Sequence, residues 1–134
     1  MLKDIETRAE LEKLLTEFYA VAVTDAKIGH YFTRVVQLDL ATHLPVIVNF
    51  WEKMLFGKPV YFGNPMIVHY HLHEKSPFEQ EHFDRWLEIF TATVDRLFQG
   101  EIADKAKAKA ETVARGMFAA LNQTSSVKTS LPSR

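Results

Sequence analysis

Apolar residues recur at helical spacing near the start of the chain, directly behind a helix-start signal. Thr7 and Glu10 have the spacing of a capping box, in which a hydroxyl and a carboxylate satisfy the free backbone amides of a first turn. Behind them, one helical face collects Leu11, Leu14, Leu15, Phe18 and Ala22. This pattern predicts a helix from Thr7 to about Thr24.

The next segment predicts a short corner followed by a second helix. Gly29 interrupts residues 25–35, which are too few for a long helix. Asp39 is placed to cap the helix that follows, and Gly57 is placed to stop it. Pro45 costs little if it lies in the first turn of that helix. Its apolar face consists of Leu40, Leu44, Ile47, Val48, Trp51, Met54 and Leu55.

Two further helices complete the pattern. The capping box at 76–79, with Pro77 at the first helical position, predicts the start of a long helix that Gly100 closes. The last helix is expected to begin near Glu101. The apolar stripe of the long helix consists of Phe83, Trp86, Leu87, Phe90, Val94, Leu97 and Phe98. The chain is therefore expected to be one all-α domain over residues 1–121.

The last segment, residues 122–134, has a different composition. It is rich in Ser, Thr and Lys and has few apolar side chains. Such a segment cannot offset the entropy cost of being ordered. The sequence predicts a disordered C-terminal tail.

Composition excludes several classes of function. The chain has 134 residues and no cysteine, which excludes disulfides, iron–sulfur clusters and thiolate zinc sites. Sixteen Lys and Arg balance seventeen Asp and Glu, so nucleic acid is not an expected partner. No apolar run approaches the length of a membrane span, and no signal-like segment opens the chain, so we expect a cytoplasmic protein without a membrane partner. Any metal must be held by His or carboxylate.

Three histidines, His69, His71 and His73, are separated by two positions each. In a strand all three would face the same way, as in a non-haem metal site, whereas in a helix His69 and His73 share one face. A non-haem site also needs a carboxylate, and the neighbouring glutamates fall at a helix cap or on an exposed face. A single histidine in such a place is more often a solvated side chain than a ligand.

Three polar aromatic residues, Tyr19, His43 and Trp86, come from three different predicted helices. Each by itself is more often a hydrogen-bonded core residue than a functional one. Together they would supply several hydrogen-bond donors to an aromatic cavity. His69 could then provide a ligand from the opposite side.

Several motifs in order along the chain resemble one known family. They are Phe18-Tyr19, Phe32, His43-Leu44-Pro45, Asn49-Phe50-Trp51, Gly63-Asn64-Pro65-Met66 before His69, and His82-Phe83-Asp84-Arg85-Trp86-Leu87. In this order and at these spacings they resemble the group III truncated haemoglobins, over nearly the whole chain from Leu11 to Leu121. The resemblance implies a truncated globin fold, a two-over-two helical sandwich around haem b.

The resemblance also implies roles for individual residues. His69 matches the proximal ligand of the haem iron, and His73 is its competitor for that role. Tyr19, His43 and Trp86 match the distal residues that surround a bound ligand. The expected cofactor-binding side chains are Phe32, Ile47, Phe50, Trp51, Met54, Leu72 and Phe83.

The function implied by the resemblance is the binding of oxygen and related diatomic ligands, as in oxygen transport. Redox chemistry on nitric oxide or peroxide, of a dioxygenase or peroxidase type, would fit the same site and would require a reductase as partner. Two alternatives remain open from the residues alone. One is a non-haem metal protein that uses His69, His71 and His73, and the other is a haem-free helical interaction domain.

Overall fold

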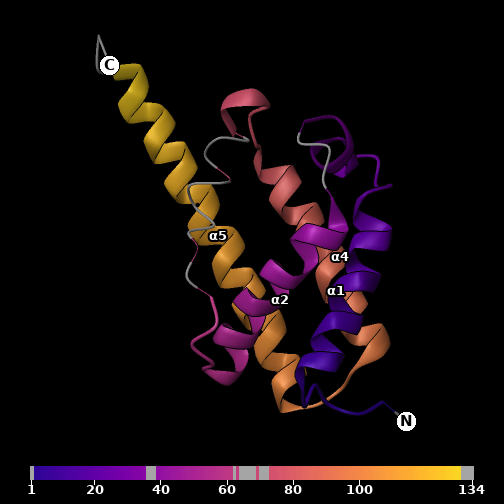
Figure 1. Cartoon of the computed structure of the whole chain (residues 1–134). Helices are drawn as coiled ribbons and strands as arrows, with labels where there is room; N and C mark the ends of the chain where they lie inside the picture. Colours follow the sequence, from indigo (N-terminus) through magenta and orange to yellow (C-terminus); the bar gives the residue numbers. More distant parts are fainter. Residues whose placement is uncertain (1, 36–38, 62, 64–68, 70–72, 131–134) are drawn as a thin grey trace.

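The computed structural model describes residues 2–35, 39–61, 63, 69 and 73–130, with side chains as far as Leu121. Within these residues the chain forms helices and connecting segments without a strand, so the all-α prediction is confirmed. The elements in chain order are α1 (Arg8–Ala22), the π-helix η1 (Tyr31–Val35), α2 (Leu40–Phe56), α4 (Gln80–Leu97) and α5 (Glu101–Ser130) (Figure 1).

The four long helices form two packed pairs. Helix α1 packs against α2, and α4 packs against α5; α1 also contacts α4, and α2 also contacts α5 (Figure 1). This is the arrangement expected for a two-over-two helical sandwich. The largest fully buried side chains at its centre are Phe18, Phe90, Ile5, Leu11, Leu14, Leu15, Leu121, Val48 and Val94.

The start of α1 and both ends of α2 follow local sequence signals. The backbone N–H of Thr7 donates to the Glu10 carboxylate at 2.7 Å, as the capping box predicted. Asp39 accepts from the backbone N–H of Ala41 at 3.1 Å. Gly57 ends α2 in the left-handed conformation, with φ 70° and ψ 18°, which glycine adopts at little cost. The two predicted helix starts and the predicted stop are confirmed.

Pro45 lies inside α2, beyond its first turn. The condition under which Pro45 would cost little is therefore not met, because the helix begins at Leu40. A proline at this position leaves the carbonyl of Ala41 without its usual intrahelical donor. Pro45 and Ala41 are both exposed, so water can take the place of that donor.

Helix α4 begins at Gln80, with Glu79 as its N-cap, and not at Pro77 as the sequence predicted. The backbone N–H of Glu79 donates to Nδ1 of His82 at 2.9 Å. Just before Glu79, the Pro77 carbonyl accepts from the Tyr31 hydroxyl, and the Phe78 N–H donates to Nδ1 of His73. The Pro77 carbonyl therefore bonds to a side chain of η1 instead of to a following turn of helix.

The N-terminal segment packs on the start of α5. The carboxylate of Asp4 accepts from the backbone N–H groups of Ile102 and Ala103, at 2.9 and 2.8 Å. Gly100, with φ 148°, lets the chain pass Asp4, since a Cβ there would lie 2.5 Å from the Asp4 Cγ. Ile5 beside this contact is fully buried. The helix start near Glu101 is confirmed, and its cap comes from the other end of the chain.

Helix α5 is longer than predicted, because its backbone continues past Leu121 to Ser130 and projects beyond the other helices (Figure 1). The sequence contains no Gly or Pro between Met117 and Pro132, so no local signal stops the helix. The side chains of residues 122–130 and all of residues 131–134 lie outside the described part. The predicted disorder of residues 122–134 therefore stays a prediction.

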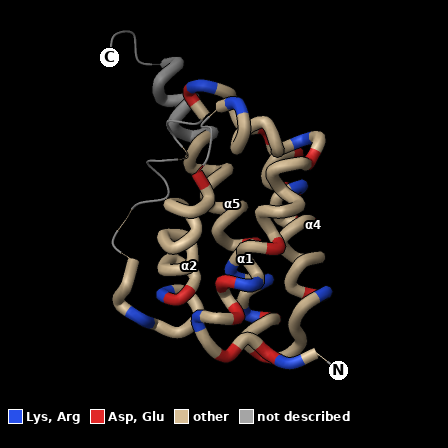
Figure 2. The backbone as a smooth tube through the Cα atoms, turned by 45° about the vertical axis from the view of Figure 1, so that its right-hand side comes forward, with Lys and Arg blue, Asp and Glu red and all other residues tan. Residues whose placement is uncertain are grey.

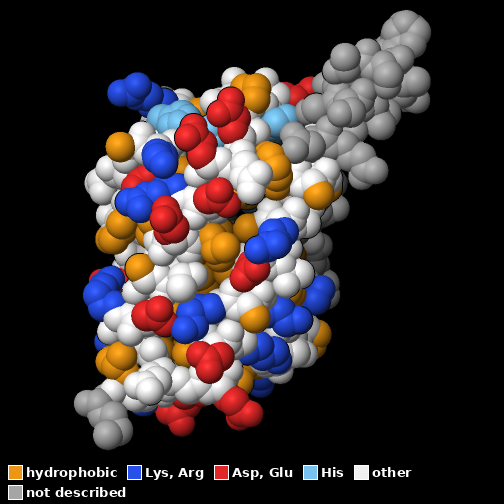
Figure 3. All heavy atoms as spheres, turned by 180° about the vertical axis from the view of Figure 1, so that it is seen from behind, with side chains coloured by type: hydrophobic (Ala, Val, Ile, Leu, Met, Phe, Trp, Pro, Cys, Tyr) orange, Lys and Arg blue, Asp and Glu red, His pale blue; other side chains and the backbone are white. Residues whose placement is uncertain are grey.

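Charged side chains are spread over the domain. Lys and Arg are interspersed with Asp and Glu along the helices (Figure 2) and over the face seen in Figure 3. None of the described helices combines the length and apolar character that crossing a bilayer would require.

Candidate functional site

Tyr19 of α1 and His43 of α2 meet at the tips of their side chains. The Tyr19 hydroxyl lies 3.2 Å from Nε2 of His43, and the two rings are nearly perpendicular, 5.8 Å apart. Tyr19 is 6% exposed, and burial raises the pKa of its phenol. The phenol therefore keeps its proton at neutral pH and remains a hydrogen-bond donor.

His69 lies within electrostatic range of this pair. Burial, and then the charge on His69, lower the pKa of the half-buried His43. Both effects favour the neutral imidazole of His43 at neutral pH. His43 lies on α2 and His69 lies in the segment before α4, so the two imidazoles come from different parts of the chain.

The ring of Phe78 packs beside His69. The two ring centroids are 6.1 Å apart. Tyr31 of η1 stacks on Phe78 with centroids 4.5 Å apart, and its hydroxyl donates to the Pro77 carbonyl at 2.9 Å. Nδ1 of His73 accepts from the backbone N–H of Phe78 at 2.9 Å. Sequence reasoning did not assign Tyr31 or Phe78 to the site, although each directly neighbours a residue that it used.

Trp86 of α4 reaches the distal pair through Phe18. Its ring lies 5.9 Å from Phe18 in an edge contact, and Phe18 in turn lies 5.1 Å from Tyr19. Trp86 also stacks on Phe90, with centroids 5.5 Å apart. Trp86 is half-buried, so part of its indole stays accessible beside this aromatic group.

Five of the predicted cofactor-binding side chains are partly buried. Phe32, Ile47, Phe50 and Met54 are partly buried and pack against the core cluster, and Phe32 makes an edge contact with Tyr19 at 5.7 Å. Phe83 is also partly buried. It lies between Phe78 and Phe118, at 5.3 and 5.5 Å.

Trp51 is different from these side chains. It is 3% exposed and stacks on Phe90 at 4.9 Å, so it belongs to the core behind the site. Leu72, another predicted cofactor-binding residue, lies outside the described residues, as does His71.

The backbone at His69 and at residues 73–75 is helical. The strand arrangement that would turn the three histidines to one side is therefore wrong at His69 and His73. Among the described residues, no group of three or more His, Cys, Asp or Glu could hold a metal ion. The neighbouring rings of the two histidines are aromatic, with Tyr19 beside His43 and Phe78 beside His69.

Comparison with known proteins agrees with this geometry. The family model described as bacterial-like globin matches residues 3–122. The chain belongs to the bacterial-like globin family. This globin is similar to the group 3 truncated hemoglobin of Campylobacter jejuni, with 29% identity over 107 residues, covering 78% of this chain and 82% of that protein.

The fold of this globin is also similar to a solved structure. The match is to the crystal structure of group III truncated hemoglobin from Campylobacter jejuni, with a TM-score of 0.79 and 27% sequence identity. It covers 90% of this chain and 95% of that one. The predicted truncated globin fold is confirmed. Family membership supports a haem-binding globin.

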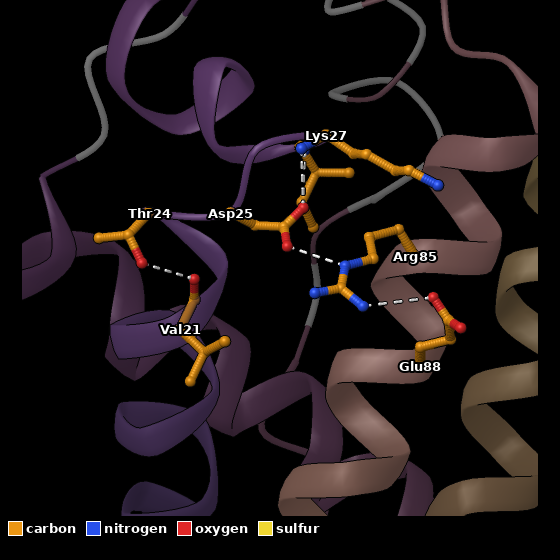
Figure 4. A network of polar contacts seen from close by, with 7 residues as sticks. Val21, Thr24, Asp25, Lys27, Arg85 and Glu88 are labelled. Atoms are coloured by element: carbon orange, nitrogen blue, oxygen red, sulfur yellow. Dashed lines mark hydrogen bonds and ion pairs between the residues drawn. The ribbon is translucent and has the colours of Figure 1, made fainter.

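An ion pair anchors the corner that carries Phe32 in this globin. Oδ1 of Asp25 lies 2.8 Å from Nε of Arg85 on α4, and Oδ2 accepts from the backbone N–H groups of Lys27 and Ile28 (Figure 4). Burial opposes ionisation of Asp25, but the guanidinium and the two amides hold the pKa of its carboxyl below the ordinary value. The corner is thereby joined to α4 next to Trp86.

Proposed function

We propose that this globin binds haem b between α2 and the segment that carries His69, and that it binds oxygen and related diatomic ligands. Ferrous haem supplies a metal centre that takes up such gases reversibly. The observation that carries the proposal is the contact of the Tyr19 hydroxyl of α1 with Nε2 of His43 of α2, at 3.2 Å.

On the proximal side, we assign the axial ligand to His69. A neutral imidazole nitrogen is a good ligand for haem iron. His73 is the less suitable candidate, because its Nδ1 already accepts the backbone N–H of Phe78. That bond ties the ring of His73 to the backbone next to Phe78.

On the distal side, Tyr19 is the principal donor. In the tautomer of His43 that carries its proton on Nε2, the imidazole donates to the Tyr19 oxygen. The phenol proton is then free for a ligand in the pocket. A well-placed donor in a dry site stabilises an acceptor ligand by about 0.5–1.5 kcal/mol. The rings of Phe18 and Phe32 make edge contacts with Tyr19, and Trp86 is proposed as a second donor.

Oxygen binding is the function we put first, ahead of redox chemistry on nitric oxide or peroxide. Hydrogen-bond donors that surround the ligand favour retention of oxygen, and the described residues give no comparable support for a particular redox reaction. Multiple turnover of either redox reaction would need an electron donor. A reductase partner belongs to that alternative.

The test is the visible absorption spectrum of the purified chain, recorded with and without added haemin, in the reduced state and under carbon monoxide. We expect one haem per chain and a shift of the Soret band with carbon monoxide. A chain with bound metal but no Soret band would favour the non-haem metal protein. A chain that takes up no stoichiometric haem or metal would favour the interaction domain.

A further inference from the structure

Tyr31 is a buried tyrosine whose contacts all lie at one end of the domain. It is 4% exposed. Its hydroxyl donates to the Pro77 carbonyl at 2.9 Å and lies 3.3 Å from Nδ1 of His82. The bond to Pro77 connects η1 directly to the segment that leads into α4.

The ring of Tyr31 covers Phe78, which in turn packs against two histidines. Tyr31 and Phe78 are stacked, with an interplanar angle of 23° and centroids 4.5 Å apart. Phe78 lies 6.1 Å from His69, tilted by 39°, and 6.1 Å from His73, nearly parallel to it at 16°. The Phe78 ring therefore has Tyr31 stacked against it and the rings of His69 and His73 as further neighbours.

We propose that Tyr31 is a positioning residue for His69, acting through Phe78. The hydroxyl fixes the backbone at Pro77, the ring stack fixes the Phe78 side chain, and Phe78 restricts the orientation of the His69 imidazole. The inference rests on the proposed function, because it takes His69 as the axial ligand of haem.

The same corner also contacts the distal side. Phe32, the next residue of η1, makes an edge contact with Tyr19 at 5.7 Å. Two consecutive residues of η1 thus contact different parts of the site, Tyr31 through Phe78 and Phe32 through Tyr19. Asp25 and Arg85 tie the start of this corner to α4 (Figure 4). The corner therefore has two anchors, Asp25 on Arg85 of α4 and Tyr31 on the segment just before α4.

The experiment compares Tyr31→Phe with Thr93→Val in the full chain. Each variant removes one buried hydroxyl that donates to a backbone carbonyl, at Pro77 for Tyr31 and at Ile89 for Thr93, the latter at 2.7 Å. Thr93 lies in the core of α4, so its variant reports a general loss of stability. Tyr31→Phe keeps the ring and therefore keeps the stack.

The first readout is amide hydrogen exchange at Phe78, measured on the chain as purified and again after haem is added. We expect Tyr31→Phe to speed exchange by about two- to tenfold, the range that one hydrogen bond supplies. The second readout is the iron–histidine stretching band of the ferrous haem-loaded chain by resonance Raman spectroscopy. We expect that band to shift in Tyr31→Phe and in Phe78→Leu, and to stay unchanged in Thr93→Val.

The positioning role is overturned if Tyr31→Phe leaves either the Phe78 exchange or the stretching band as in the wild type. It is overturned as well if Thr93→Val produces the same changes. His69→Ala separates this inference from the proposed function. A stretching band that survives in His69→Ala contradicts the assignment of the axial ligand, and the Phe78 exchange then shows independently whether Tyr31 holds the segment.

Discussion

The hydroxyl of Tyr19 lies 3.2 Å from Nε2 of His43, across 24 positions of sequence and between two different helices. Neither residue has a charged partner in this contact, and burial keeps both in their neutral forms. The hydroxyl group is thereby held in one place next to an imidazole. This contact is the basis for the first prediction.

Tyr19→Phe should raise the oxygen off-rate of the haem-loaded chain several-fold. The change removes a donor worth about 0.5–1.5 kcal/mol with almost no change in packing. Oxygen is the stronger acceptor, so the carbon monoxide off-rate should stay nearly the same. Stopped-flow displacement of each gas measures both rates.

Trp86→Phe should act in the same direction, because the indole N–H is the second proposed donor. Together the two donors should slow oxygen release by roughly ten- to a hundredfold, at ~1.4 kcal/mol per factor of ten. Equal effects of either variant on both gases, or no effect on either, would show that these side chains belong to the core and that access alone controls the distal site.

His69→Ala should abolish tight haem binding or leave a five-coordinate iron that added imidazole restores. His71→Ala should keep a normal absorption spectrum. His73→Ala should keep the axial bond as well. It should destabilise the backbone near Phe78, because it removes the acceptor of the Phe78 N–H. Loss of ligation in His73→Ala together with normal ligation in His69→Ala would mean that the ligand lies one helical turn later.

Asp25→Asn should destabilise the domain in a pH-dependent way. Folding lowers the pKa of the Asp25 carboxyl. Its ionised form therefore stabilises the folded state above the ordinary pKa of an aspartate, ~3.9, and this stabilisation is lost as the pH falls through the lower pKa of the folded state. At neutral pH the variant should melt a few degrees below the wild type, and the gap should close below about pH 4.

Urea unfolding across this pH range tests the Asp25 prediction. Asp95→Asn is the matched control, since Asp95 pairs with Lys107 at 2.6 Å but has a side chain that is 56% exposed. Exposed pairs of this kind contribute little to stability. If the free energy of unfolding of the wild type exceeds that of Asp25→Asn by the same amount at pH ~3 and at neutral pH, the prediction is contradicted.

Gly100→Ala should destabilise the domain by about 1–3 kcal/mol. Gly100 has φ 148°, and a Cβ there would lie 2.5 Å from Cγ of Asp4, which caps α5. Gly116→Ala is the control, because a Cβ at that helical position meets nothing within 4 Å. It should be neutral or stabilising by about 0.5–1 kcal/mol. Equal thermal stability of the two variants would show that the Asp4 contact is dispensable.

Deletion of residues 122–134 should leave the melting temperature and the haem affinity nearly unchanged. The segment has few apolar side chains with which to dock, and the family model ends at residue 122. Calorimetry and haem titration of the shortened chain test this. A loss of several degrees would mean that the end of α5 packs against the domain.

The helices of this globin could be predicted where their signals are local. The capping box of Thr7 and Glu10, the Asp39 cap and the Gly57 stop each act within one or two turns of chain, and the structure confirms all three. The start of α4 could not be predicted in the same way. In place of the expected capping box at 76–79, the Pro77 carbonyl accepts from the Tyr31 hydroxyl and the Phe78 N–H donates to His73, and sequence spacing does not reveal these bonds.

For the candidate site, too, some features could be predicted from the sequence and others could not. The sequence by itself determined which residues are candidates for the site, because the order and spacing of the motifs around Tyr19, His43, His69 and Trp86 resemble one family. Only the tertiary structure decided that Tyr19 meets His43 and that Trp51 belongs to the core. It also showed that Phe78 packs beside His69 and that Tyr31 stacks on Phe78. Helical periodicity reports which face of a helix is apolar, but which side chains meet across helices depends on how those helices pack.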